Sequence, residues 1–376
     1  MKIAFFFTYG YSLKTWKESG TLERELKTLE ILSNKYDYKF TLITYGDVED
    51  KTIIKNYKNF QIIPIYTIIK RRKNKLLNYL ISFFIPFKLR KYLTDIDIIH
   101  QHQLLGSWIS IILKLILKKP LLTRTGYDMY LFAKKDNKSF YISMLYNLLT
   151  KVTIYFSNYY TVTSLTDFKY LNSKYKIKNR LLYRPNYIEL GLNSPLEKRF
   201  ENTVLCVGRL VNQKNFKLLI SEFKNTKNEF EIHIVGEGYL KDELKSFALE
   251  NNVNLKLLGS MEYKELKKLY QQYKFFISTS LFEGNPKTLL EAMASGCIVL
   301  ASNISNHSEI IKNEINGFIF SLNEPKLLET LYKLKSNTKL ENQISCNSVK
   351  HVKEHNSLDN LIKLLDNDYK NLNLER

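Results

Sequence analysis

The feature that most constrains the fold of this chain is a rhythm of short apolar runs, each followed by a turn and then by a helical pattern. Residues 3–8 form the first apolar run, and Tyr9-Gly10 ends it. Residues 21–34 then place Leu22, Leu26 and Leu29 on one helical face. Short apolar strands that alternate with helices indicate βαβ units and a parallel sheet, and therefore an α/β fold.

The rhythm runs through the whole chain. Helices are predicted at 21–34, 239–250, 263–273, 325–333 and 357–372, and a crossover helix after Trp108 ends at Pro120. Strands are predicted at 3–8, 40–45, 61–66, 96–101, 120–125, 159–164, 180–184, 203–207, 231–235, 254–258, 275–278, 298–301 and 317–320.

The rhythm pauses at residues 188–201, where Gly, Pro, Asn and charged residues gather as they do in a linker. A chain of 376 residues is long enough for two domains of ordinary size. We therefore expect one domain over residues 1–188 and a second over 200–356. The last helix, 357–376, is expected to rejoin the first domain.

A formal net charge of +20 indicates a negatively charged partner, such as nucleic acid, anionic lipid or a phosphorylated ligand. No nucleic-acid-binding motif is visible, so no nucleic acid partner is expected. The cysteines Cys206, Cys297 and Cys346 are far apart and odd in number, which indicates neither a disulfide framework nor a zinc site. No apolar run is long enough to cross a membrane, and the first is too short for a signal peptide. We expect a cytoplasmic location.

Residues 68–93 combine a basic cluster, Lys70-Arg71-Arg72-Lys73, with many leucine, isoleucine and phenylalanine side chains. A basic segment rich in aromatic residues can lie in a membrane interface against anionic lipid. A crossover helix with a solvated basic face has the same composition. Both interpretations stay open at this point.

The stretch 282–296 carries the strongest local signal for a ligand. Asn285 suits a helix N-cap and Pro286 the first helical position, so a helix is predicted from Pro286 to about Ser295, ending near Gly296. Its first turn leaves three amides without intrahelical partners, and such a helix start attracts a phosphate. These amides belong to Lys287, Thr288 and Leu289.

Two carboxylates flank this helix start. Glu283 precedes the helix, and Gly284 beside it lets a ligand approach the backbone. Glu291 lies within the helix among apolar residues, where a carboxylate is costly unless it accepts hydrogen bonds. Hydroxyls of a sugar or ribose would supply them. A capped amphipathic helix with one glutamate facing solvent is the other interpretation.

Glycine turns follow several strands of the second half. Gly208-Arg209, Gly236-x-Gly238, Gly259-Ser260 and Glu283-Gly284 all come at the carboxyl ends of predicted strands. In an open parallel sheet, ligands bind at that edge. Arg209 and Lys214 add two positive charges there, so the predicted ligand is a nucleoside diphosphate. In the first half, His100 and His102 end a strand without nearby carboxylate or thiol ligands, which favours a ligand crevice over a metal site.

With these motifs the chain resembles family 4 of the glycosyltransferases. The resemblance covers nearly the whole chain and is concentrated in residues 203–320. It depends on five motifs: Gly208-Arg209 with Lys214-Asn215, Val235-Gly-Glu-Gly238, Leu258-Gly259, Glu283-Gly-Asn-Pro286 with Glu291-Ala-Met-Ala-Ser-Gly296, and Glu309-Ile-Ile with Asn316-Gly317. It implies the GT-B fold, in which two Rossmann-like domains with parallel sheets face each other across a cleft. Residues 1–188 would bind the acceptor and 200–356 the nucleotide-sugar.

The resemblance also implies roles for the candidate residues. Arg209 and Lys214 would hold the donor diphosphate and stabilise the departing nucleotide without a metal or other cofactor. Glu283 would contact the donor sugar and Glu291 the ribose, while Gly236 and Gly259 would flank the base. Gly20 would approach the diphosphate from the first domain. Such enzymes resemble retaining transferases, in which a donor phosphate oxygen can take the acceptor's proton.

The chain departs from the family pattern at two places. Thr125 stands where many relatives carry a histidine, so Asp128, His102 or Thr125 itself would contact the donor sugar, unless the sugar is held differently. The loop with Ser12, Lys14 and Trp16 replaces a small glycine-rich loop, and we assign it to acceptor binding.

We therefore predict a hexosyltransferase that builds a cell-surface polysaccharide or glycolipid. Its acceptor would be a glycan or lipid-linked, and the enzyme would be peripheral on the inner face of the cell membrane. Two alternatives stay open: a sugar-nucleotide epimerase or hydrolase on the same scaffold, against which the spacing of Glu283 and Glu291 argues, and a basic nucleic-acid-binding protein, motivated by charge alone.

Overall fold

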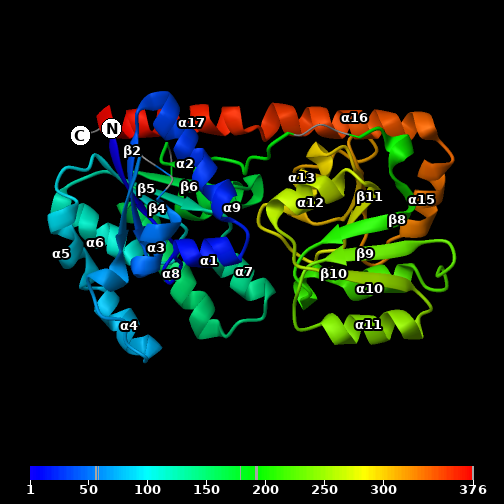
Figure 1. The fold of residues 1–376 in the computed structure, drawn as a ribbon, viewed down its shortest axis with the longest axis horizontal. Helices are drawn as coiled ribbons and strands as arrows, with labels where there is room; N and C mark the ends of the chain where they lie inside the picture. Colours follow the sequence, from blue (N-terminus) through cyan, green and yellow to red (C-terminus); the bar gives the residue numbers. More distant parts are fainter. Residues whose placement is uncertain (56, 58, 178, 191–193, 375–376) are drawn as a thin grey trace. The chain divides into compact units, whose positions relative to one another are not determined.

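The computed structural model describes residues 1–55, 57, 59–177, 179–190 and 194–374. They form two compact units (Figure 1). Unit 1 contains Met1–Arg184 and returns with the last helix from Leu361 onwards, and unit 2 contains Pro185–Asn360.

Unit 1 is built on a seven-stranded sheet with the order β3-β2-β1-β4-β5-β6-β7. All of its strand pairs are parallel. The order reverses beside β1, and right-handed crossovers then place helices on both faces of the sheet. The strands are β1 Lys2–Phe6, β2 Lys39–Thr44, β3 Phe60–Pro64, β4 Ile98–His102, β5 Leu121–Thr125, β6 Tyr159–Val162 and β7 Leu181–Tyr183.

The helices of unit 1 differ in how far they are covered. The apolar side of α6 packs with β1, β4 and α5 in one core cluster that includes Phe6, Ile99 and Trp108. The α-helices are α1 Leu13–Glu18, α2 Leu22–Tyr36, α3 Val48–Ile53, α4 Lys75–Ser82, α5 Ile85–Leu89, α6 Ser107–Leu117, α7 Met129–Lys135, α8 Phe140–Phe156, α9 Leu165–Tyr175 and α17 Leu358–Leu374. Ile65–Thr67 and Arg90–Tyr92 are 3-10 helices.

Helix α17 lies along unit 1 (Figure 1). Polar side-chain contacts hold it there. Arg184 donates two hydrogen bonds to the carboxylate of Asp368. The hydroxyl of Tyr38 donates to Asp366. Tyr369 is fully buried, and its hydroxyl lies 2.5 Å from Nδ1 of His100. His100 therefore lies beneath α17 and does not line a crevice.

Unit 2 is built on a six-stranded sheet with the order β10-β9-β8-β11-β12-β13. Its strand pairs are again all parallel. The strands are β8 Phe200–Val207, β9 Glu231–Val235, β10 Asn254–Gly259, β11 Tyr273–Ser278, β12 Ile298–Ser302 and β13 Phe318–Phe320. The predicted α/β class with parallel sheets is thus confirmed.

Two core clusters lie in unit 2, one of which packs α13 between β11, β12 and α12. The α-helices are α10 Phe216–Glu222, α11 Lys241–Glu250, α12 Tyr263–Tyr270, α13 Lys287–Ala294, α14 Ser305–Ser308, α15 Leu327–Lys335 and α16 Thr338–His355. Leu196–Lys198 and Asn212–Lys214 are 3-10 helices. Eight helices of the two units were not foreseen: α1, α3, α7, α8, α9, α10, α14 and α16. The two longest of them show no clear amphipathic period, because α8 is apolar on most sides and α16 is largely polar.

Candidate active site

The candidate site lies at the point in unit 2 where the strand order reverses. Strand β8 is followed along the chain by β9 on one side, whereas β11 is followed by β12 on the other. Such a switch point leaves a crevice at the carboxyl ends of the two central strands. Gly208 and Arg209 follow β8, and residues 279–286 follow β11, so both motifs meet at this crevice.

Glycines form the side of the crevice above β8 and β9. Gly236 has a φ of +147°, and a Cβ atom there would lie 2.0 Å from the carbonyl oxygen of Gly208. A Cβ atom on Gly238 would lie 2.3 Å from the carbonyl oxygen of Leu210. The amide of Gly236 donates to the carbonyl of Gly259, so the turns after β9 and β10 are tied together. Only glycine fits these positions, because neighbouring backbones touch.

An ion pair links the two sides of the switch point. The ammonium of Lys214 contacts Oε1 of Glu283, with side-chain exposures of 15% and 10%. The Ser280 hydroxyl donates to the same oxygen over 2.7 Å. The Thr279 hydroxyl donates to the carbonyl of Lys214, and the Gln213 amide donates to the carbonyl of Phe282. Glu283 is therefore held by a bond from its own loop, and two further bonds tie that loop to the segment that carries Lys214.

Arg209 differs from Lys214 because its side chain is exposed. Leu210, the next residue, is buried and anchors the loop. No residue in the described ranges forms an ion pair with the Arg209 guanidinium. The crevice thus carries one cation that is paired in place and one that faces solvent, which suits a ligand that brings its own negative charge.

Helix α13 begins one residue later than predicted. Its N-cap is Pro286, with an extended ψ of 90°, and the predicted N-cap Asn285 was wrong. The preceding loop is held extended by side-chain donors: Asn306 donates to the carbonyl of Gly284, and Asn186 to that of Asn285. The helix ends at Ser295 before Gly296, as predicted. Buried Arg199 donates to the Ser295 carbonyl and holds that end of the helix.

The start of α13 presents backbone donors at the crevice. The first bond within the helix runs from the Leu290 amide to the Pro286 carbonyl. The amides of Lys287, Thr288 and Leu289 precede it, so they point out of the helix start. The helix dipole adds a partial positive charge at the same place.

Glu291 lies in the buried part of α13 and is 5% exposed. The hydroxyl of Tyr270 donates to its Oε2 over 3.1 Å. Burial and the neighbouring Glu291 raise the pKa of Tyr270 well above its ordinary value, so the phenol stays protonated as a donor. The interpretation of Glu291 as a solvent-facing glutamate of an amphipathic helix is wrong, because the side chain is buried and hydrogen-bonded.

His307 stands behind the ion pair and was not singled out from the sequence. It is fully buried, and its Nδ1 donates to the carbonyl of Ser302 over 2.9 Å. Burial lowers the pKa of His307 to about 4, although the hydrogen bond to Ser302 and the charge of Glu283 act to raise it, and Lys214 adds a smaller lowering. The imidazole is therefore neutral at physiological pH. Its sequence signal was weak, because a single histidine on a short helix carries no motif.

The candidates of unit 1 lie at the carboxyl edge of its sheet, but most are covered. Trp16 is 5% exposed and stacks on Phe7 at a ring distance of 4.0 Å. His102 is buried, with Nε2 4.0 Å from Glu25. Thr125 is 1% exposed within the sheet. Asp128 caps α7 by accepting from the Leu131 amide, and burial raises its pKa.

Two candidates of unit 1 are more open. Gly20 is half-buried after α1 with a φ of +67°, which a side chain would strain. Lys14 is exposed, pairs with Glu49, and lines a polar hollow of about 550 Å3. Lys70 and Arg71 line the same hollow, so the basic start of the 68–93 segment reaches the strand ends.

The 68–93 segment is not a single crossover helix. It forms α4, α5 and a 3-10 turn, with Ile85 and Leu89 buried inward. Its outer side exposes apolar as well as basic side chains, with Leu76 and Phe84 each 66% exposed. The other exposed apolar residues are Leu77, Leu80, Phe83, Phe87 and Tyr92.

Two further properties concern the described residues as a whole. None of their helices has the length and apolar character needed to cross a bilayer. None of their His, Cys, Asp and Glu side chains gather in threes around a point where a metal ion would fit.

Comparison with known proteins shows that the chain is similar to glycosyltransferases in sequence and in fold. Residues 193–351 match the family described as "Glycosyl transferases group 1". An uncharacterised glycosyltransferase of Methanocaldococcus jannaschii is 26% identical over 325 residues, which cover 83% of this chain and 84% of the relative. The crystal structure of HepE from Anabaena in complex with UDP and glucose superposes with a TM-score of 0.75 at 15% identity, covering 99% of this chain and 100% of that one.

A second relative has a named activity. It is the "GalNAc-alpha-(1->4)-GalNAc-alpha-(1->3)-diNAcBac-PP-undecaprenol alpha-1,4-N-acetyl-D-galactosaminyltransferase" of Campylobacter jejuni. It is 24% identical over 315 residues, which cover 80% of this chain and 81% of the relative. The chain has the GT-B fold, and the comparisons support a glycosyltransferase.

Proposed function

We propose that this chain is a retaining hexosyltransferase of the family 4 type. It would move a sugar from a nucleoside diphosphate sugar to a glycan or lipid-linked acceptor, in the synthesis of a cell-surface polysaccharide or glycolipid. The observation that carries the proposal is the Lys214–Glu283 pair at the switch point, with glycine turns on one side and the α13 start on the other. HepE, whose structure holds UDP and glucose, has the same fold and supports this donor class.

The donor diphosphate would replace Glu283 as the partner of Lys214. Lys214 and the exposed Arg209 would then bind the phosphates, together with the amides of Thr288 and Leu289. Glu283, held by Ser280, would be released to accept hydrogen bonds from sugar hydroxyls. Gly208, Gly236, Gly259 and Gly284 would let the donor approach the backbone.

The ribose would meet Glu291. The hydroxyl of Tyr270 donates to one of its oxygens, and the carboxylate would accept further hydrogen bonds from the ribose hydroxyls. In this proposal the ligand gives a reason for a carboxylate in an apolar helix. The cost of its burial is offset by hydrogen bonds that the ligand completes.

In the transfer itself, the bond between the sugar's anomeric carbon and the phosphate oxygen breaks. The acceptor oxygen bonds to the same face of that carbon, and its proton passes to a donor phosphate oxygen. No side-chain base is needed for this proton. Arg209 and Lys214 would stabilise the negative charge that grows on the leaving diphosphate, so no metal is required by this scheme.

The acceptor would bind in unit 1. The hollow beside Lys14 is lined by Lys70 and Arg71 and also by the carboxylates of Glu18, Asp47, Glu49 and Asp50, so it offers groups of both charges to a polar acceptor. The Campylobacter jejuni relative is named for a diphosphate-linked undecaprenol acceptor, which supports a lipid-linked acceptor. The exposed apolar side of α4 adjoins the basic cluster, so the 68–93 segment would rest on the inner face of an anionic cell membrane. A contact of Gly20 with the donor diphosphate stays a prediction. So do contacts of His102, Thr125 and Asp128 with the acceptor or the donor sugar. The burial of Trp16 argues against its predicted contact with the acceptor.

Thermal unfolding against a panel of UDP-, GDP-, ADP-, CMP- and dTDP-sugars tests the donor site. A donor that binds the folded chain raises its midpoint by mass action. We expect a shift with one nucleotide that disappears in Arg209→Ala and persists in Lys217→Ala, an exposed lysine paired with Glu243. No shift with any nucleotide would contradict the proposal. Formation of an epimer or free sugar without acceptor would instead indicate an epimerase or hydrolase.

A further inference from the structure

Helix α8 of unit 1 exposes an apolar stripe along its whole length. Within its 17 residues the sequence has one charged side chain, Lys151, and no acidic one. Tyr141 and Tyr155 near the two ends are 84% and 72% exposed, and Leu145 and Leu148 between them are 55% and 57% exposed. Phe140, Ile142, Met144 and Val152 complete the exposed set. A continuous apolar patch of this kind on a protein surface marks an interaction site.

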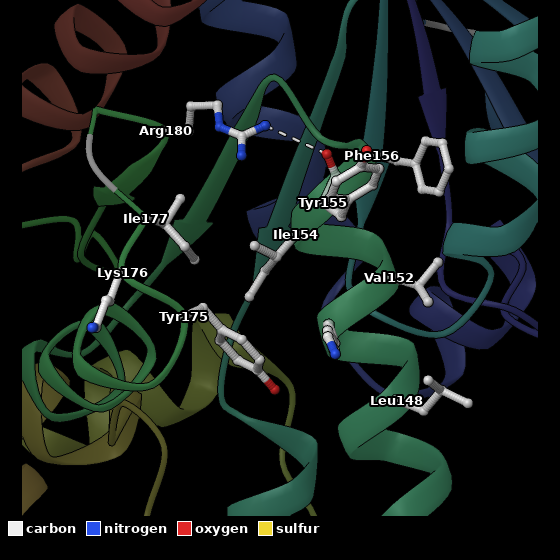
Figure 2. A pocket seen from close by; sticks show the side chains of 10 residues that line it. Leu148, Val152, Ile154, Tyr155, Phe156, Tyr175, Lys176, Ile177 and Arg180 are labelled. Carbon is white, nitrogen blue, oxygen red and sulfur yellow. Dashed lines mark hydrogen bonds between the residues drawn. The ribbon is translucent and has the colours of Figure 1, made fainter.

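The stripe borders a hollow of about 640 Å3 (Figure 2). The hollow lies between the second half of α8 and the segment that joins α9 to β7. Ile154, Tyr175 and Ile177 gather in its interior, and the first and last of these also belong to the apolar cluster under β6 and β7. Leu148 and Val152 connect its wall to the exposed stripe. The hollow is therefore an apolar recess that continues onto an apolar surface.

The charged residues around this recess are all cations. Lys151, Lys176 and Arg180 line it, and none of the described residues that line it is acidic. Lys176 and Arg180 are exposed. Nη1 of Arg180 lies 3.4 Å from the carbonyl oxygens of Tyr155 and Ser157, which turns the guanidinium toward the end of α8. An occupant that fits this lining has a long apolar part and an anionic head.

We propose that α8 docks on an anionic lipid bilayer and that the recess takes one acyl chain of a bilayer phospholipid, whose phosphate meets Lys151, Lys176 and Arg180. A helix that exposes apolar side chains beside a group of cations is suited to lie in the interface of an anionic membrane. A second copy of the chain fits less well. In a two-fold dimer through α8, the same cations of both copies would come together without acidic partners.

This surface is separate from the 68–93 segment and from the nucleotide site of unit 2. In the view of Figure 1, α4 and α8 both project from unit 1 on the side away from α17. The proposal does not depend on the sugar-transfer reaction. Its failure would leave the donor site intact, and failure of the donor site would leave this surface in place.

Flotation of the full chain with phosphatidylcholine vesicles, with and without phosphatidylglycerol, tests the docking. We expect binding that requires phosphatidylglycerol and falls about tenfold in the variant Tyr141→Glu/Leu145→Glu, because both exposed side chains lose their apolar surface. Lys151→Gln/Lys176→Gln should weaken it about fivefold or more. The matched control is Leu249→Glu on α11 of unit 2, where Leu249 is 77% exposed, and it should bind as the unchanged chain does.

A second variant separates α8 from the 68–93 segment. Leu76→Glu/Phe84→Glu is expected to weaken binding without abolishing it. If it abolishes binding while Tyr141→Glu/Leu145→Glu has no effect, the α8 proposal is overturned. An α8-dependent dimer in light scattering, without vesicle binding, would overturn it in favour of a second copy.

The recess needs its own test. Leu148→Trp should fill its mouth while keeping the stripe apolar. Binding of a short-chain phosphatidylglycerol, kept below its micelle concentration, is expected to fall several-fold in this variant, while vesicle binding persists. Unchanged binding of the short-chain lipid would show that no acyl chain enters the recess.

Discussion

The carboxyl edges of the two sheets differ in what they present. In unit 2 the edge is bare backbone: Gly208, Gly236 and Gly259 bring turns into contact, and one ion pair stands above them. In unit 1 the corresponding edge is covered by bulky or buried side chains such as Trp16 and His102, and it also has a hollow lined by charged residues of both signs. The two sheets are built alike, but the edge in unit 2 suits a diphosphate and the edge in unit 1 suits a ligand that side chains recognise.

The difference has a physical reason. A diphosphate is bound by backbone amides and a few cations, and close approach to backbone removes side chains from the turns. A sugar or lipid acceptor is recognised by side chains of many kinds, which set no rule for the residues of a turn. The predictions below test whether the two edges divide the work in this way.

The largest effect is expected at the ion pair of unit 2. Lys214→Ala should lower kcat/KM for sugar transfer by about 10^2 to 10^3-fold, because a cation at the leaving diphosphate is lost. Initial rates with a donor and a glycan or lipid-linked acceptor measure this. Lys217→Ala, three positions along the chain, removes an exposed lysine and should change the rate by less than about twofold. Equal rates for both variants would show that Lys214 takes no part in catalysis.

The next prediction compares a glycine from each edge. Gly236→Ala should lower the free energy of unfolding by about 3 kcal/mol, because its Cβ would lie 2.0 Å from the Gly208 carbonyl oxygen at a φ of +147°. Gly10→Ala in unit 1 also has a positive φ, +83°, but nothing lies within 4 Å of its Cβ. It should cost only about 1 kcal/mol. Denaturant unfolding measures both.

If the two glycine variants lost equal stability, positive φ alone would explain the cost, and the close approach of backbones in unit 2 would have no energetic consequence. Donor binding sharpens the comparison further. Gly236→Ala is expected to abolish the nucleotide-induced thermal shift, whereas Gly10→Ala should retain it.

The buried histidine behind the ion pair predicts a pH dependence. Burial lowers the pKa of His307 from 6.5 to about 4, so the unfolded chain binds its proton more readily than the folded chain. Stability is therefore lost as the pH falls from about 6.5 towards 4, by about 2 kcal/mol at pH 5 relative to pH 7. His307→Asn should be less stable at pH 7 but lose less on acidification.

The measurement is the difference between the two unfolding free energies at each pH. Burial also lowers the pKa of His100 in unit 1 well below its ordinary value and that of His351 to about 4, so both variants will still lose some stability in acid. Only the difference between the curves reports His307. Parallel curves would mean that its pKa is close to 6.5 in the folded chain.

Features that depend on local sequence signals could be predicted, whereas features that depend on contacts between distant residues could not. The strands were predictable because buried apolar runs and the turns after them are local signals. The glycine turns after β8, β9 and β10 were predictable because each follows directly on a predicted strand. The start of α13 was misplaced, because Asn186 and Asn306 hold its loop extended from distant positions. No local pattern contains such contacts.

Helix α8 shows a different limit. Its sequence is apolar on most sides, so periodicity distinguishes neither a helix nor a buried face. That its stripe is exposed follows from its packing, in which Ser143, Thr150 and Thr153 face inward and Thr153 bonds to Ser107 of α6. Likewise, the burial of Trp16 against Phe7 depends on the path of the chain after β1. Sequence reasoning placed that residue in a loop and assigned it to the acceptor.

The smallest effect expected is none at all. If Arg209 and Lys214 supply the positive charge at the leaving diphosphate, a chelator such as EDTA should leave the transfer rate within about twofold, because the reaction would then not depend on a metal ion. Lys214→Ala makes this test sharper. In the variant, added Mg2+ or Mn2+ should fail to restore the rate, since the described part of unit 2 gathers no three carboxylate, thiol or imidazole ligands to hold the ion. Rescue of Lys214→Ala by Mg2+, or loss of the unchanged chain's activity in EDTA, would instead mean that the donor brings a metal to this edge, and that the bare backbone of unit 2 binds a metal-diphosphate complex.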